Sequence, residues 1–135
     1  MTGARAKTFK FLGDVGRYSP SDAFVVRIQG DISSKDKLLH ALYEKLDLPG
    51  YFGFNWDALV DCLRDFHWVA KKRIVIAHEN IPPLGGQELK IYLEILADSV
   101  LDWKPGDEHE LEVVFPESTR DRIETLLGEA NRDGE

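Results

Sequence analysis

Three short β-branched runs, separated by helical segments, are the feature that most limits what this chain can fold into. The runs lie at 23–30 (AFVVRIQG), 73–79 (RIVIAHE) and 111–115 (LEVVF), and each has the composition of a buried strand. Strands that alternate with helices along a chain favour a parallel sheet with right-handed crossover connections. The sequence therefore predicts an α/β domain in which helices pack on a three-stranded parallel sheet.

Apolar residues recur at helical spacing in the segments between and after these strands. Helices are predicted at about 33–46, 56–65 and 86–101, with a last one after Pro116. Ser33, with Asp36 three residues further on, is the expected N-cap of the first helix, and Ser118 is the cap candidate of the last.

Both ends of the chain extend beyond this predicted core. Residues 8–12 (TFKFL) are expected to form an extra N-terminal edge strand, and the chain after Pro116 an extra C-terminal helix. We therefore predict an N-terminal extension at 1–22, a core domain at 23–116, and a C-terminal helix and tail at 117–135.

Charge and cysteine content restrict the classes of function. The net charge is −7, from 24 acidic and 17 basic residues, so the protein should repel nucleic acid and attract basic partners. The chain starts without an apolar run of signal-peptide length, and no stretch of about 18 apolar residues predicts a membrane span. Cys62 is the only cysteine, which excludes an internal disulfide and a cysteine-based zinc site. These features favour a cytoplasmic protein that binds neither membranes nor nucleic acid.

Residues 48–66 (LPGYFGFNWDALVDCLRDF) join a glycine- and aromatic-rich loop to a helix with three aspartates. Asn55 is the expected N-cap, which places Asp57 in the first turn, where the helix dipole favours negative charge. Asp61 should repel Asp57 by about a few tenths of a kcal/mol, and Asp65, near the C-terminal end, opposes the dipole. Helix stability therefore accounts for Asp57 and does not account for Asp61 and Asp65. A binding surface and an ordinary solvated acidic face both remain open.

The aromatic residues of the loop, Tyr51, Phe52 and Phe54, allow two interpretations. Rings beside carboxylates are typical of a protein-binding surface, because a rigid ring adds contact area while the carboxylates select the partner's charge. Alternatively, Phe52 and Phe54 belong to the core and only Tyr51 is exposed. The sequence does not decide between them.

The stretch LPGYFGFNWDALVDCL resembles the signature of the barstar family, intracellular protein inhibitors of secreted ribonucleases. The positions that match the pattern are Leu48, Pro49, Tyr51, Phe52, Gly53, Asn55, Asp57, Ala58, Leu59, Asp61, Cys62 and Leu63. A weaker similarity spans about residues 24–115. The resemblance implies a three-stranded parallel sheet packed by helices, and a basic ribonuclease as the protein partner.

The resemblance also implies which residues touch that partner. Tyr51, Gly53, Asn55, Asp57 and Asp61 correspond to family residues at or beside the enzyme contact. Asp61 matches the aspartate that enters the phosphate site of the nuclease, so inhibition would occur by electrostatic mimicry of RNA and steric blockage.

The expected contact surface includes further residues of the same helix, some of which depart from the family. Trp56 and Val60 differ from the residues of the best-known member, which leaves the choice of partner open. The other expected contributors are Arg64 and Asp65. The family also uses an acidic residue of a later helix, for which the candidates are Glu94, Asp98 and Asp102.

Two other classes of function compete with the inhibitor. An enzyme would use two of the carboxylates for acid–base work or for a metal. Asp57 at a helix N-terminus should stay ionised, however, and the sequence lacks His-x-Glu, paired-histidine and Gly-x-Ser-x-Gly patterns. His67, His78 and Glu79 are scattered, and Cys62 falls on the apolar side of its helix. We therefore expect no catalysis, metal, cofactor or small-molecule substrate.

The second competitor is a regulatory or scaffold module that has the barstar fold and a partner other than a nuclease. A fold alone does not determine a partner, so the family resemblance leaves this alternative open.

Overall fold

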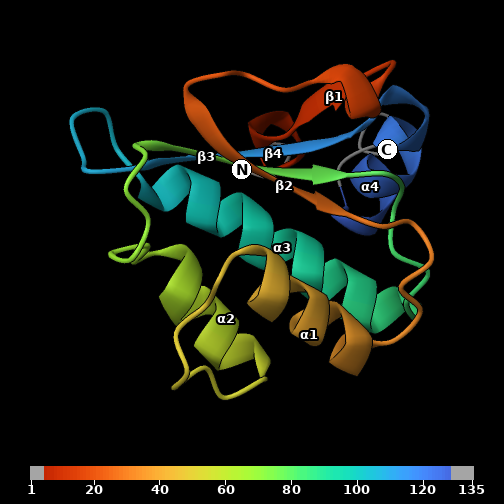
Figure 1. Cartoon of the computed structure of the whole chain (residues 1–135). Helices are drawn as coiled ribbons and strands as arrows, with labels where there is room; N and C mark the ends of the chain where they lie inside the picture. The colour runs from red at the N-terminus through yellow and green to blue at the C-terminus, as the bar shows by residue number, and fades with distance from the viewer. Residues whose placement is uncertain (1–4, 129–135) are drawn as a thin grey trace.

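The computed structural model of the chain describes residues 5–128, which form a four-stranded parallel sheet with helices packed on it (Figure 1). The strands are β1 (Lys10–Leu12), β2 (Ala23–Ile28), β3 (Arg73–His78) and β4 (Glu110–Pro116). Their order in the sheet is β1-β4-β3-β2, and every neighbouring pair is parallel. The predicted α/β class and parallel sheet are confirmed, and the N-terminal edge strand is present beside β4.

The helices connect and follow these strands. They are α1 (Lys35–Lys45), α2 (Trp56–Leu63), α3 (Gly86–Asp102) and α4 (Arg120–Leu126). Short 3₁₀ turns precede β1, follow it and precede α4, at Ala6–Thr8, Val15–Arg17 and Glu117–Thr119. The predicted C-terminal helix is therefore present as α4, while the tail from residue 129 onward lies outside the described residues.

Three helix ends differ from the sequence-based expectation. The N-cap of α1 is Ser34, whose Oγ accepts a hydrogen bond from the backbone N–H of Lys37 at 3.1 Å, and Ser33 lies one residue too early. Ser118 is part of the 3₁₀ turn that starts the last helical segment, so it does not cap α4.

The third difference is the end of α2, which stops at Leu63, before the predicted Asp65. Phe66 is completely buried and has a φ of 52°, in the left-handed region. The chain must leave the helical path to place this ring in the core. Asp65 consequently lies in the turn after the helix.

One face of the sheet carries the main core. Helices α1, α2 and α3 lie together on this face, below the sheet in Figure 1. Their buried leucines join the inward side chains of the strands in one apolar cluster that includes Leu42, Leu59, Leu93, Ile76 and Phe115. The helices α2 and α3 are thus attached to a rigid support.

The opposite face is covered by the segment between β1 and β2. Val15 packs there on Val75, Ala77 and Val114 in a smaller apolar cluster. Arg27 of β2 holds the same segment, because its guanidinium donates hydrogen bonds to the backbone carbonyls of Val15 at 3.0 Å and Tyr18 at 2.6 Å. The N-terminal segment is therefore packed on the sheet as part of the domain.

Candidate protein-binding surface

A network of local contacts fixes the entry into α2. The Asn55 side-chain oxygen accepts a hydrogen bond from the Ala58 N–H at 2.7 Å, which confirms Asn55 as the N-cap. The Asn55 side-chain amide donates in turn to the Gly53 carbonyl at 3.3 Å. A Cβ atom on Gly53 would lie 3.2 Å from that amide nitrogen, so a larger residue would disturb the cap. These two exposed residues thus shape the loop that leads into α2.

The loop aromatics divide between the core and the solvent. Phe52 is buried, and Phe54 is half-buried against it, with ring centroids 4.9 Å apart. Phe54 has a φ of 54° and is held between Phe52 and the rings of His40 and Tyr43, at 4.3 and 5.0 Å. Tyr51, in contrast, is 70% exposed. The core interpretation is thus correct for Phe52 and only partly correct for Phe54.

The α2 helix has one buried apolar face and one exposed acidic face. Leu59, Cys62 and Leu63 are buried, whereas Asp57 and Asp61 are exposed one turn apart. Among residues 5–128, no hydrogen bond or ion pair joins either of these two carboxylates to another protein group. Helix α2 therefore presents two unpaired negative charges to the solvent.

Trp56 and Val60 lie half-buried at the border of α2. The Trp56 indole stacks on the ring of Tyr92 in α3, at 6.3 Å, and the Lys35 ammonium lies 5.4 Å from the indole centroid. Trp56 thus connects the first turn of α2 to both α3 and α1, which makes it a structural anchor as well as a candidate contact residue.

The third aspartate of the motif is held in a different way. The Asp65 carboxylate accepts a hydrogen bond from the His67 backbone N–H at 3.2 Å and pairs with the His67 ring at 2.8 Å. The pKa of the Tyr51 phenol is raised, first by loss of hydration and then by the negative charge of Asp65. Asp65 therefore already has a partner inside the protein.

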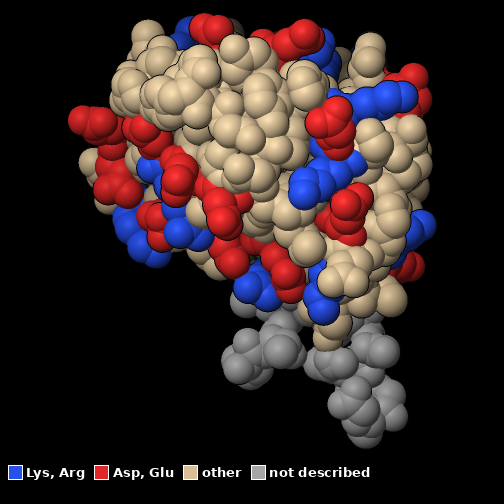
Figure 2. Space-filling view, turned by 90° about the horizontal axis from the view of Figure 1, so that it is seen from below, with Lys and Arg blue, Asp and Glu red and all other residues tan. Residues whose placement is uncertain are grey.

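Each of the three candidate acids of α3 forms an ion pair with an arginine. Arg64 pairs with Asp102 at 3.6 Å, and Arg5 contacts both Glu94 and Asp98. Figure 2 views this helical side from below and shows acidic side chains following one another across it, some with a basic side chain alongside. The acids of α3 are therefore neutralised in part, whereas Asp57 and Asp61 are not.

The residues considered for catalysis do not form a site. His67 is exposed, His78 is buried, and Glu79 accepts a hydrogen bond from the Gly30 N–H. Burial, followed by the charges of Asp65 and Asp61, raises the pKa of the Cys62 thiol to about 11, so the thiol is a packing group rather than a nucleophile. Within residues 5–128, no group of three or more His, Cys, Asp or Glu side chains is placed to hold a metal ion.

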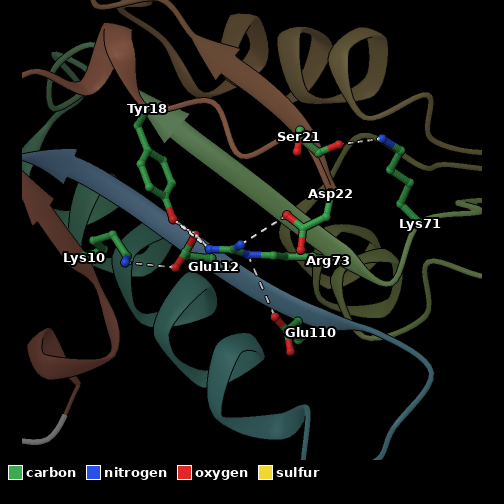
Figure 3. Close-up of polar contacts among 8 residues, drawn as sticks. All are labelled: Lys10, Tyr18, Ser21, Asp22, Lys71, Arg73, Glu110 and Glu112. Atoms are coloured by element: carbon green, nitrogen blue, oxygen red, sulfur yellow. Dashed lines mark hydrogen bonds and ion pairs between the residues drawn. The ribbon is translucent and has the colours of Figure 1, made fainter.

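A second polar cluster lies on the opposite face of the sheet (Figure 3). The guanidinium of Arg73 in β3 donates hydrogen bonds to the Tyr18 hydroxyl at 2.8 Å and to the Glu112 carboxylate of β4 at 3.1 Å. It also forms an ion pair with Asp22 at 3.3 Å. Lys10 of β1 pairs with the same Glu112 at 3.4 Å. Every charge drawn here has a partner, so the cluster fastens the N-terminal segment to the sheet.

Two interactions that shape the candidate surface had no counterpart in the sequence patterns. The Trp103 indole N–H donates to the Leu63 carbonyl at 2.9 Å and so completes the C-terminal end of α2. Arg5 contacts acids about ninety positions further along the chain. Only the tertiary structure brings these partners together, and no local spacing signals them.

The fold and the surface together define a small parallel α/β domain with an acidic, aromatic-flanked helix on its outside. The chain belongs to the barstar family, since the family model described as Barstar (barnase inhibitor) matches residues 23–131. A comparison with curated proteins finds no match. None of the helices within residues 5–128 has both the length and the apolar character needed to cross a lipid bilayer.

Proposed function

We propose that this protein is a cytoplasmic inhibitor of a basic ribonuclease and acts as an immunity protein by covering the active site of that enzyme. The proposed contact surface consists of Tyr51 with Asp57 and Asp61, and the residues around it complete the contact: Gly53, Asn55, Trp56, Val60, Arg64 and Asp65. Membership of a family described as barnase inhibitors supports this function.

The observation that carries the proposal is the pair of exposed, unpaired carboxylates on α2 beside an exposed tyrosine. A ribonuclease active site must hold a phosphodiester and therefore contains arginine, lysine or histidine cations. Carboxylates accept charge-assisted hydrogen bonds from these cations much as phosphate oxygens do. Within the described part of the chain, Asp57 and Asp61 are free of internal partners when they do so, whereas Asp65 already has a hydrogen-bond partner in His67 and Asp102 has an ion pair with Arg64.

The rigidity of the surface favours tight binding. Asn55 caps α2, Trp56 stacks on α3, and the Trp103 indole binds the last turn, so the two aspartates lie on a helix fixed at both ends. A preorganised surface loses little conformational entropy when it binds. The negative net charge would also steer a basic partner toward the protein.

The protein itself is proposed to have no catalytic activity and to need no metal or cofactor. His67, His78, Glu79 and Cys62 are separated or buried, so neither a nucleophile with its base nor a ligand set is formed by them. Hydrolysis of RNA by the purified protein, especially if a chelator abolished it, would contradict this part of the proposal.

The decisive experiment is a titration of barnase and of other basic secreted ribonucleases with this protein, read out as cleavage of a fluorogenic RNA. We expect stoichiometric inhibition of at least one of them. Asp61→Ala should weaken inhibition by about 3 kcal/mol or more, the scale for removing one partner of a buried charge pair. Asp121→Ala, which removes an exposed carboxylate of α4, is the matched control and should inhibit like the wild type.

The alternative is a regulatory module with a non-nuclease partner. It would be favoured if no basic ribonuclease were inhibited, or if Asp61→Ala inhibited within about threefold of the wild type, a difference of roughly 0.7 kcal/mol. Thermal melts of both variants show whether a loss of inhibition reflects a loss of fold.

A further inference from the structure

Arg5 lies ahead of the residues matched to the family and binds two carboxylates of α3. Its Nε and Nη2 atoms donate to the two carboxylate oxygens of Asp98 at 3.0 and 3.1 Å, which is a two-pronged contact. Its Nη1 atom donates to Glu94 at 3.4 Å. A single guanidinium from the N-terminal segment thus neutralises two successive acids of one helix.

These acids continue toward the proposed contact surface. Glu94, Asp98 and Asp102 are spaced by four residues and therefore lie along one side of α3, one turn apart. Asp102, the last of the three, pairs with Arg64, the C-cap residue that follows α2. Arg5 is therefore bound to the same side of α3 as the acid that pairs with the end of α2.

The position of Arg5 does not depend on its ion pairs. Its neighbour Ala6 is buried, and Phe9 packs in the main core with its ring centroid 5.3 Å from that of Phe115. The side chains of Arg5 and Asp98 are 42% and 39% exposed, and ion pairs with such exposure contribute little to folding. The main effect of Arg5 is thus on the charge that α3 presents to a partner.

We propose that Arg5 is a specificity determinant that occupies Glu94 and Asp98 and so withholds them from basic partners. A partner is then left with Asp57 and Asp61 as its accessible unpaired carboxylates on α2. The contact also shows that the two α3 acids can accept hydrogen bonds from an arginine guanidinium. The identity of the partner rests on the proposed function, whereas the masking of α3 does not.

The test compares two variants that remove the same charge. Arg5→Gln frees the α3 acids, while Arg17→Gln removes an arginine whose side chain is 87% exposed, from the segment that covers the opposite face of the sheet. Hexa-arginine peptide is titrated into both by calorimetry at low salt. We expect Arg5→Gln to bind the peptide at least threefold more tightly than Arg17→Gln. Equal affinities would overturn the proposal, because they would show a dependence on net charge alone.

A further variant links the gain to the named carboxylates. Addition of Glu94→Gln and Asp98→Asn to Arg5→Gln should remove the gain, so that the peptide binds this triple variant no more tightly than Arg17→Gln. A gain that persists in this triple variant would also overturn the proposal. If Arg5→Gln melts too early to be measured, Glu94→Gln with Asp98→Asn is made with Arg5 intact. Its control is Asp31→Asn with Asp121→Asn, which removes the same charge from two exposed carboxylates elsewhere. A peptide affinity more than threefold below that of this control would show that α3 was not masked.

The ribonuclease titration separates this inference from the proposed function. If no ribonuclease is bound but the peptide results are as expected, the proposed function is wrong and the masking by Arg5 stands. If a ribonuclease is inhibited but Arg5→Gln and Arg17→Gln bind the peptide equally, the proposed function stands and the role of Arg5 is wrong.

Discussion

His78 and Tyr92 share a 2.7 Å hydrogen bond in the core, between the imidazole Nε2 atom and the tyrosine hydroxyl. The Nδ1 atom of His78 lies 3.1 Å from the Val114 carbonyl, which can only accept, so the ring donates there and accepts from Tyr92. The Tyr92 ring in turn stacks on Trp56, the first residue of α2. Strands β3 and β4 are thereby connected through α3 to the start of the candidate surface.

Acid should destabilise the fold through His78. Burial lowers the pKa of this imidazole from 6.5 to about 4. Below pH 6.5 the unfolded chain takes up a proton that the folded chain does not, so stability falls as the pH falls toward about 4. Between pH 6.5 and about 5 this loss is about 2 kcal/mol, at about 1.4 kcal/mol per pH unit. Urea unfolding across this pH range measures the loss of stability. Imidazole resonances of His78 that titrate near pH 6.5 in the folded protein would contradict the prediction.

Removal of the Tyr92 hydroxyl should destabilise the protein without opening a large cavity. In Tyr92→Phe the Nε2 atom of His78 remains buried without its donor, which costs about 1–3 kcal/mol. Tyr43→Phe is the matched control, since no hydrogen bond joins the Tyr43 hydroxyl to another described residue. Chemical denaturation gives the free energy of unfolding of the wild type and of the two variants, and only Tyr92→Phe should be destabilised. Equal stability of the two variants would mean that the buried hydrogen bond is not needed.

Loss of the α2 cap should affect binding more than loss of the α1 cap. Asn55→Ala removes the acceptor for the Ala58 N–H and should cost about 1 kcal/mol of stability. Ser34→Ala removes the equivalent acceptor from α1 at a similar cost, at a residue that is not part of the proposed contact surface. Inhibition of a ribonuclease, compared with thermal melts, separates the two effects.

The control for this comparison is Asn55→Asp, which keeps a capping oxygen and should retain most of the stability. If Asn55→Ala and Ser34→Ala reduced inhibition equally, the cap of α2 would have no particular role in holding the contact surface.

The sequence predicts the elements of this fold better than their ends. Buried parallel strands are β-branched runs, so the three core strands were recognisable, and Asn55 was recognisable as a cap from its side chain and position. The end of α2 could not be predicted in this way, because the burial of Phe66 in the tertiary core draws the chain out of the helix before Asp65. The partner of Arg5 was also beyond local patterns, since Asp98 is 93 residues away.

Association with a basic ribonuclease should depend steeply on salt, while Asp61 should mainly determine how slowly the complex dissociates. The protein has a net charge of −7, and long-range attraction between opposite charges is screened over roughly 10 Å or less above about 0.1 M salt. The association rate should therefore fall by about tenfold or more between about 0.05 and 0.5 M salt. Stopped-flow mixing at several salt concentrations measures this rate for the wild type, Asp61→Ala and Asp65→Ala.

Asp65 is already paired with His67, so its loss should change binding little, whereas loss of the unpaired Asp61 should mainly speed dissociation. If Asp65→Ala weakened binding as much as Asp61→Ala, the contact would be centred on the turn after α2, and mimicry of phosphate by Asp61 would be wrong for this protein.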